Sequence, residues 1–140
     1  MAKHVRDAMT AEVRSATPTQ SLTEAAEMMK AEDVGSVPVV DDGRLVGIVT
    51  DRDIVLRAVA ERRDPQAVTI DEVASRELVT VDPEQDLDEA LRLMAERQVR
   101  RLPVVEDGRL VGMLAQADVA IEAAGKKVAE AVEQISKPAG

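Results

Sequence analysis

The chain has 140 residues, of which 45% are hydrophobic, and it carries a net charge of −9 at pH 7. That length fits one compact domain or two very small ones, and the negative charge disfavours nucleic acid and anionic membranes as partners. The chain contains no Phe, Tyr, Trp or Cys, which excludes stacking of bases on aromatic rings, disulfide bonds and thiol chemistry.

Residues 21–32 have the pattern of an amphipathic helix. Ser21 and Glu24 supply the hydroxyl and the acid of a capping box at its start. A short strand around Val13 and a helical lead-in over residues 5–9 are expected before this helix. The i, i+3, i+4, i+7 spacing that places apolar side chains on one helical face is formed by Leu22, Ala25, Ala26 and Met29.

Two short β-branched runs, at residues 37–40 and 45–49, follow this helix and predict a hairpin. They are joined by the turn sequence Asp-Asp-Gly-Arg at residues 41–44, and Asp-Gly between two such runs is typical of a tight β-turn. Helical spacing of apolar residues returns over residues 51–60.

The same pattern returns 65 positions later. The segment VVDDGRLVG at residues 39–47 is repeated as VVEDGRLVG at residues 104–112. The second copy predicts a strand at 78–80, a helix at 86–97, and a hairpin followed by a helix over 102–124. A repeat of this length indicates a duplicated small domain. We therefore expect an α+β fold of two tandem β-α-β-β-α units that share one core and pack about a pseudo-two-fold axis.

The repeat also sets the expected domain boundaries. The first unit covers residues 1–64, and the second covers 65–124 and begins with a helical lead-in at 69–74. The remaining residues, 125–140, form a C-terminal extension. In this extension an apolar stripe on a last helix is formed by Val128, Val132 and Ile135.

The two copies resemble the tandem cystathionine-β-synthase (CBS) domain pair, or Bateman module. The resemblance lies in residues 37–54 (VPVVDDGRLVGIVTDRDI) and 100–114 (RRLPVVEDGRLVGML). It covers all but about the last fifteen residues, and the length is similar to that of small stand-alone bacterial CBS proteins of the hypoxic-response type. The resemblance implies two clefts between the paired units, which in this family often bind AMP, ADP, ATP, NAD or S-adenosylmethionine.

A family motif, Gly-hydrophobic-x-Ser/Thr-x-x-Asp, supplies the aspartate that binds ribose. Residues 47–53 match it fully, with Thr50 and Asp53, whereas residues 112–118 carry Asp118 but have Ala115 in place of the hydroxyl residue. The helix N-terminus at Thr50 would also present free N–H groups to an anion. A second interpretation stays open, because Thr-x-x-Asp is itself a helix capping box.

By analogy with the family, each cleft combines the aspartate of one unit with the early strand of the other. One cleft would join Asp118 to Thr17, Val34, Ser36 and Arg101. The other would join Asp53, Thr50 and Arg52 to Asp82 and Val99. Because the carboxylate of Asp82 would repel a nearby phosphate, and because Ala115 lacks a hydroxyl, we expect the two sites to differ in affinity.

These observations favour a regulatory module that senses an adenosine-containing nucleotide (AMP, ATP, NAD or S-adenosylmethionine type) and acts on a regulated protein partner. The alternative is a ligand-free interaction or scaffold module whose helices, with residues 126–135, bind another protein. No catalytic residues are expected, because the sequence offers no nucleophile–base pair. With one histidine, His4, and no cysteine, a transition-metal site of the usual type is not expected either.

Assembly and location follow from the same features. We expect a homodimer formed through the helices that follow the hairpins. No apolar run reaches the ~20 residues of a membrane span, and the first residues lack the apolar core of a signal peptide. A cytoplasmic protein is therefore expected.

Overall fold

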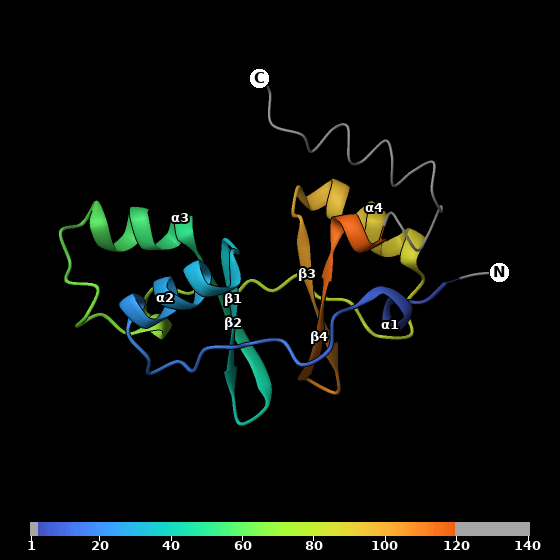
Figure 1. The fold of residues 1–140 in the computed structure, drawn as a ribbon, viewed down its shortest axis with the longest axis horizontal. Coiled ribbons are helices and arrows are strands. Elements are labelled where there is room, and N and C mark those ends of the chain that lie inside the picture. Colours follow the sequence, from blue (N-terminus) through green and yellow to red (C-terminus); the bar gives the residue numbers. More distant parts are fainter. Residues whose placement is uncertain (1–2, 120–140) are drawn as a thin grey trace, which may run out of the picture. The chain divides into compact units, whose positions relative to one another are not determined.

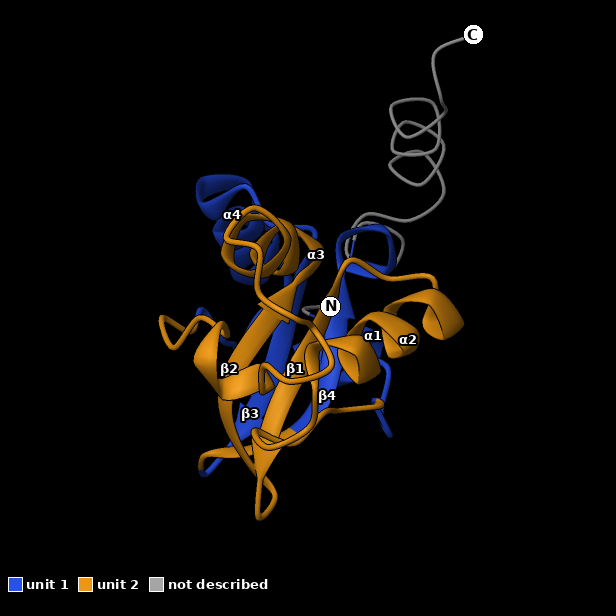
Figure 2. Ribbon diagram, turned by 90° about the vertical axis from the view of Figure 1, so that its left-hand side faces the viewer, with its two compact units in different colours: residues 1–13, 79–107, 111–140 blue, residues 14–78, 108–110 orange. Residues whose placement is uncertain are grey.

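The computed structural model describes residues 3–119. These residues form two compact units, named as in Figure 2. Within the described part of the chain, unit 1 consists of residues 3–13, 79–107 and 111–119, and unit 2 of residues 14–78 and 108–110. Each unit therefore contains segments from both sequence repeats.

Unit 2 contains most of the first repeat. Its elements are α2 (Leu22–Glu32), β1 (Ser36–Asp41), β2 (Arg44–Thr50), α3 (Asp51–Ile54), the π-helical turn η1 (Val55–Val59) and the 3₁₀ turn η2 (Ile70–Glu72), of which the α-helices and strands are labelled in Figure 1. Helix α2 begins where the Ser21 hydroxyl accepts a hydrogen bond from the Glu24 N–H, and it ends at Asp33, which has a left-handed conformation. The predicted helix and its Ser21 cap are confirmed, but the Glu24 arm of the predicted capping box does not form.

Strands β1 and β2 form the predicted hairpin. They pair antiparallel from Ser36 opposite Thr50 to Asp41 opposite Arg44, with a bulge between Val39 and Val40. The turn residues Asp42 and Gly43 both have positive φ angles, 52° and 80°. Positive φ at two central positions is the requirement of a type I′ turn, which explains the Asp-Gly sequence.

Unit 1 contains most of the second repeat. Its elements are α1 (Val5–Ala8), α4 (Leu87–Arg97), β3 (Arg101–Glu106) and β4 (Arg109–Ala115), of which residues 109–110 are grouped with unit 2. A helix begins at residue 116 and is described as far as residue 119. The left-handed residue Gln98 ends α4 as Asp33 ends α2, so the two repeats terminate their first long helix in the same way.

Each unit has its own apolar core, which corrects the expectation that the two units share one core. The core of unit 2 includes Leu22, Met28, Met29, Val37, Val39, Val49 and Ile70. The core of unit 1 includes Val5, Val81, Leu87, Met94, Leu102, Val104 and Leu114. Both cores are aliphatic, with methionine filling the space under the long helices, which suits a chain without aromatic residues.

The two lead-in segments are exchanged between the repeats. Residues 3–10, from the start of the first repeat, pack in unit 1, where Thr10 and Met113 exchange two backbone hydrogen bonds of 2.9 Å. The equivalent residues of the second repeat pack in unit 2, where Ser75 and Ile48 exchange bonds of 2.8 and 3.0 Å. Val5 and Ile70 are each fully buried in the core they complete.

Glycines permit this close packing of the lead-ins. A Cβ atom built on Gly112 would lie 2.9 Å from the Thr10 carbonyl oxygen, and one built on Gly47 would lie 3.0 Å from the Ser75 carbonyl oxygen. Both distances are too short for ordinary contact. The repeated glycine after each Leu-Val pair is therefore required by the approach of a backbone segment.

Three predictions differ from the structure in detail. The first strands expected around Val13 and at 78–80 occur only as isolated parallel bridges, Ala16 with Val39 and Val81 with Val104. The predicted helix at 51–60 is present, but its second half is π-helical, with the Ala60 N–H bonded to the Val55 carbonyl at 2.8 Å.

Two of the expectations from the sequence stay predictions. The last predicted helix, over 125–140, lies outside the described residues. The repeat boundaries at 1–64 and 65–124 stay a prediction. Within residues 3–119, no helix combines the length and the apolar composition needed to cross a membrane.

Candidate functional site

Asp53 lies at the start of α3, directly after β2, and its carboxylate closes a capping box with Thr50. The Thr50 hydroxyl accepts a hydrogen bond from the Asp53 N–H at 3.0 Å, and Asp53 Oδ2 accepts one from the Thr50 N–H at 3.0 Å. Asp53 is half-buried. One carboxylate oxygen is therefore used by the helix cap, while Oδ1 has no hydrogen-bond partner within residues 3–119.

The N–H groups around the α3 start are already bonded, which corrects the expectation that they are free. The Asp51 N–H donates to the Gly35 carbonyl at 2.9 Å, and the Arg52 N–H lies 2.8 Å from Asp51 Oδ1. Together with the two cap bonds of Thr50 and Asp53, these contacts occupy four successive donors. An anion at this position would have to displace a side-chain oxygen.

Asp118 lies at the equivalent position of the second repeat, in the helical turn after β4. The Gln116 N–H donates to the Arg100 carbonyl at 2.8 Å, as the Asp51 N–H does to Gly35. Asp118 is half-buried, and its carboxylate makes no hydrogen bond to any described residue. Because Ala115 has no hydroxyl, the capping box of the first repeat cannot form here.

Thr17 and Asp82 occupy equivalent turns in the two units, and both are exposed. The backbone N–H of each donates to the side-chain carbonyl of a glutamine three residues later, Thr17 to Gln20 at 2.9 Å and Asp82 to Gln85 at 3.0 Å. Asp82 Oδ1 also accepts from the Glu84 N–H at 2.9 Å. The Asp82 carboxylate is therefore partly used by its own turn.

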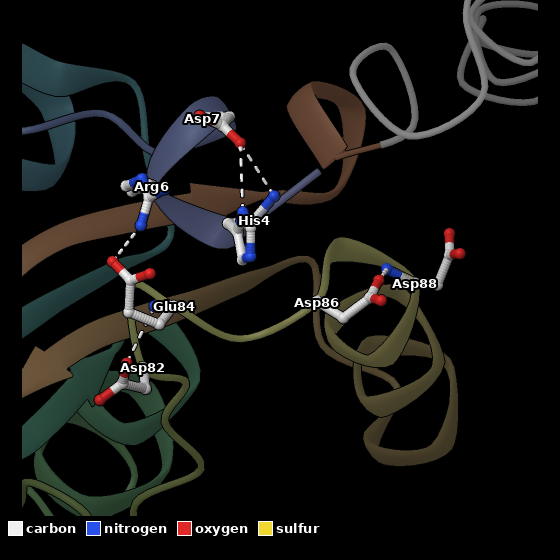
Figure 3. A network of polar contacts seen from close by, with 7 residues as sticks. All are labelled: His4, Arg6, Asp7, Asp82, Glu84, Asp86 and Asp88. Carbon is white, nitrogen blue, oxygen red and sulfur yellow. Dashed lines mark hydrogen bonds and ion pairs between the residues drawn. The ribbon is translucent and has the colours of Figure 1, made fainter. Parts of the chain in front are cut away.

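Asp82 also lies in an acidic region of unit 1. Figure 3 shows it beside Glu84, which pairs with Arg6, while Asp7 and Asp86 lie at the starts of α1 and α4. The hydrogen bond and the charge of Glu84 raise the pKa of Arg6 above its ordinary value. Negative charge near Asp82 would disfavour a free phosphate here, and the expected effect of Asp82 on nucleotide binding stays a prediction.

The remaining predicted residues lie at strand and helix starts. In unit 2, Val34 and Ser36 are half-buried around the beginning of β1, and Arg52 is exposed in the first turn of α3. In unit 1, Val99 is half-buried and Arg101 is exposed at the beginning of β3. Their assignment to two nucleotide clefts stays a prediction.

A pocket of about 460 Å³ in unit 2 was not anticipated from the sequence. It lies between the β1–β2 hairpin and the exchanged segment 70–76, and none of the ten residues predicted to bind nucleotide lines it. The sequence signal for this pocket is the difference between residue 74, an alanine, and its equivalent in the first lead-in, residue 9, a methionine.

No three His, Cys, Asp or Glu side chains in the described chain are grouped closely enough to hold a metal ion.

Comparison with known proteins identifies the family. The family model for the CBS domain matches residues 5–59 and 70–125. The CBS domain-containing protein YhcV of Bacillus subtilis is 47% identical over 117 residues, which span 84% of this chain and 83% of YhcV.

Solved structures agree with this match. The crystal structure of Hypoxic Response Protein I with two coordinated zinc ions has a TM-score of 0.78 and 41% identity, covering 84% of this chain and 97% of that one. The CBS domain pair of protein MJ0100, in complex with 5′-methylthioadenosine and S-adenosyl-L-methionine, has a TM-score of 0.74 and 29% identity, covering 85% and 94%. The predicted α+β class is confirmed, and this chain belongs to the CBS-domain family as a tandem pair of CBS domains.

Proposed function

We propose that this chain is a non-catalytic regulatory module that binds an adenosine-containing nucleotide through Asp118 and, more weakly, through Asp53. The observation that carries the proposal is the different state of the two carboxylates. Asp53 gives one oxygen to the cap of α3, whereas Asp118 makes no hydrogen bond within the described residues. Because each carboxylate oxygen can accept about two hydrogen bonds, the cap leaves Asp53 with less acceptor capacity for the two hydroxyls of a ribose than Asp118 has.

The proposal assigns Thr17, Val34, Ser36 and Arg101 to the ligand of Asp118, and Thr50, Arg52, Asp82 and Val99 to the ligand of Asp53. A threonine hydroxyl and an arginine in the first set suit a sugar and a phosphate. In the second set the carboxylate of Asp82 opposes a phosphate. Adenosine-type ligands of the related MJ0100 domain pair support the ligand class.

Titration calorimetry against AMP, ATP, NAD and S-adenosylmethionine tests this proposal. We expect one stronger and one weaker site for at least one of these ligands. Asp118→Ala should remove the stronger site and Asp53→Ala the weaker one, while Glu96→Ala, at an exposed position of α4, should leave both unchanged. Absence of heat and of thermal stabilisation with all four ligands would contradict the proposal.

A homodimer formed through α3 and η1 is the second part of the proposal. Val55, Leu56 and Val59 are 53%, 47% and 60% exposed on this helix. Large aliphatic side chains gathered on one helix favour a protein–protein contact. The same face supports the alternative of a ligand-free interaction module, which a dimer without any nucleotide binding would favour. A cytoplasmic location stays a prediction from the sequence.

A further inference from the structure

The pocket in unit 2 lies beside a position at which the two exchanged segments differ. Ala74 and Met9 occupy equivalent places beside Gly47 and Gly112, since Ser75 pairs with Ile48 as Thr10 pairs with Met113. The Met9 sulfur lies 2.8 Å from where a Cβ on Gly112 would stand, whereas at Gly47 the nearest side-chain atom is the Ala74 Cβ, at 3.4 Å. Met9 fills this space in unit 1, and Ala74 leaves it open in unit 2.

The frame of the pocket is common to both repeats. Pro18, Val39, Val46 and Gly47 form its apolar wall together with Ala74, and the sequence repeats the first four as Pro83, Val104, Val111 and Gly112. The lining residues that differ in chemical type between the two repeats all lie on the exchanged segment 70–76. Asp71, Ala74 and Arg76 correspond to Arg6, Met9 and Ala11.

The charges at the pocket are therefore also specific to unit 2. Asp41, Asp71 and Arg76 line it and are exposed. Asp71 Oδ1 accepts a hydrogen bond from the Thr69 hydroxyl, and its second oxygen is not bonded within the described residues. Neither Asp41 nor Arg76 has a side-chain hydrogen bond or an ion pair with any residue of 3–119. The pocket thus presents two carboxylates and one guanidinium around an aliphatic wall.

We propose that this pocket is a second ligand site, separate from the nucleotide site, that takes a basic α-amino acid or a compound of the same charge pattern. Such a ligand carries two cationic groups for Asp41 and Asp71 and one carboxylate for Arg76. Its aliphatic stem lies on Val39, Val46 and Ala74. A volume of about 460 Å³ is within the range of small-molecule pockets. Charges of both signs select a ligand that carries both.

A titration of the full chain with L-lysine, followed by NMR of methyl groups, tests this site. We expect the methyl resonances of Val46 and Ala74 to shift saturably at millimolar L-lysine. Norleucine lacks the side-chain ammonium and cadaverine lacks the carboxylate, so each should bind about two- to fivefold more weakly, the value expected for one exposed ion pair. Equal binding of all three compounds would overturn the charge assignment.

The repeat itself supplies matched variants. Ala74→Met places in unit 2 the residue that unit 1 accommodates, so it should fold, as checked by thermal melting, and abolish the L-lysine shifts. Met9→Ala should leave them unchanged. Asp53→Ala and Asp118→Ala should leave them unchanged as well, and AMP should not compete. Saturable binding that survives Ala74→Met, or no binding by the wild-type chain, would overturn the proposal.

Discussion

Thr10 and Met113, which are more than a hundred positions apart in the chain, form a two-way backbone pair with both hydrogen bonds at 2.9 Å. The lead-in of the first repeat is thereby fixed to the last strand of the second. Ser75 and Ile48 repeat this relationship in unit 2. Several measurable consequences depend on this exchange.

The exchanged segments should stabilise the unit in which they pack. Ile70→Ala should lower the free energy of unfolding by about 2 to 5 kcal/mol, because it opens a cavity in the core of unit 2. Val5→Ala should lower it by less, since valine loses fewer carbon atoms. Urea unfolding followed by circular dichroism measures both.

Hydrogen exchange locates these effects. Val5→Ala should speed exchange of the Met113 amide, and Ile70→Ala that of the Ile48 amide. The control, Lys30→Ala on the exposed side of α2, should change stability by no more than about 0.5 kcal/mol. If each substitution affected the amides of the opposite unit, the exchange of lead-ins would be wrong.

The glycines that admit the lead-ins should tolerate a methyl group poorly. Gly112→Ala would place a Cβ 2.8 Å from the Met9 sulfur and 2.9 Å from the Thr10 carbonyl oxygen, so it should cost about 1 to 3 kcal/mol. Gly47→Ala should cost less, because its Cβ would meet only one atom as close as 3.0 Å. Thermal melting of both variants measures the difference.

Two further variants check the cause. Adding Met9→Ala to Gly112→Ala should recover part of the loss, because one of the two contacts disappears. Gly35→Ala is the control, since its Cβ would meet only the flexible Asp51 carboxylate, at 3.2 Å. A larger loss for Gly35→Ala than for Gly112→Ala would contradict the explanation.

The two helix starts after the hairpins differ in one residue, Thr50 in the first repeat and Ala115 in the second. Removing the threonine from the first should lower stability, and adding one to the second should raise it. Thr50→Ala removes the cap that bonds the Asp53 N–H and should destabilise the chain by about 1 kcal/mol. Ala115→Thr restores the Thr-x-x-Asp box in the second repeat and should stabilise it by a similar amount. The urea midpoint measures both. If the proposed function is right, Ala115→Thr should also weaken nucleotide binding, because Asp118 then caps its own helix.

Acid should weaken the lead-in of unit 2 through Glu72. Hydrogen bonds from the Thr69 backbone and hydroxyl, followed by one from Arg63, lower the pKa of Glu72 below its ordinary value of 4.5. Because the folded chain has the lower pKa, this carboxylate stabilises the fold fully above pH 4.5, and the contribution is lost as the pH falls through the folded pKa.

Glu72→Gln should therefore lower the urea midpoint at neutral pH, and its difference from the wild type should shrink as the pH falls toward 3. Glu27→Gln, at an exposed position on α2 without a hydrogen bond to the described residues, is the control. A Glu72→Gln difference that stays constant with pH would show that the carboxylate charge does not contribute.

The exposed aliphatic side chains of α3 and η1 should determine assembly. Leu56→Asp places a charge on this face and should convert the proposed homodimer to a monomer, as measured by size-exclusion chromatography with light scattering. Ala60→Asp adds the same charge at an exposed small residue of the same segment and should leave the dimer intact. A wild-type chain that elutes as a monomer at high concentration would refute the dimer.

Local features of the fold could be predicted from the sequence because they depend on neighbouring residues. The Ser21 cap, the Asp42-Gly43 turn and the two long helices lie where their patterns indicate. The second arm of the Ser21 box does not form, and the Glu24 carboxylate accepts a hydrogen bond from the Gln20 side chain at 2.8 Å.

Non-local features could not be predicted in the same way. The spacing around Val5 and Ile70 indicates a short helical turn but does not say which repeat it packs against. The Asp53 motif matched a ribose-binding pattern and a capping box equally well, and only the coordinates show that the cap is formed. The unit 2 pocket is lined by Ala74, and the sequence does not show that this residue faces Gly47.

The exchange of lead-ins also bears on how this gene can evolve. A shortened gene that encodes one repeat would yield a chain whose opening segment has lost the strand on which it docks. That chain could complete its core only by turning the segment back on its own hairpin or by swapping it with a second molecule. Loss of either half should therefore destabilise the half that remains.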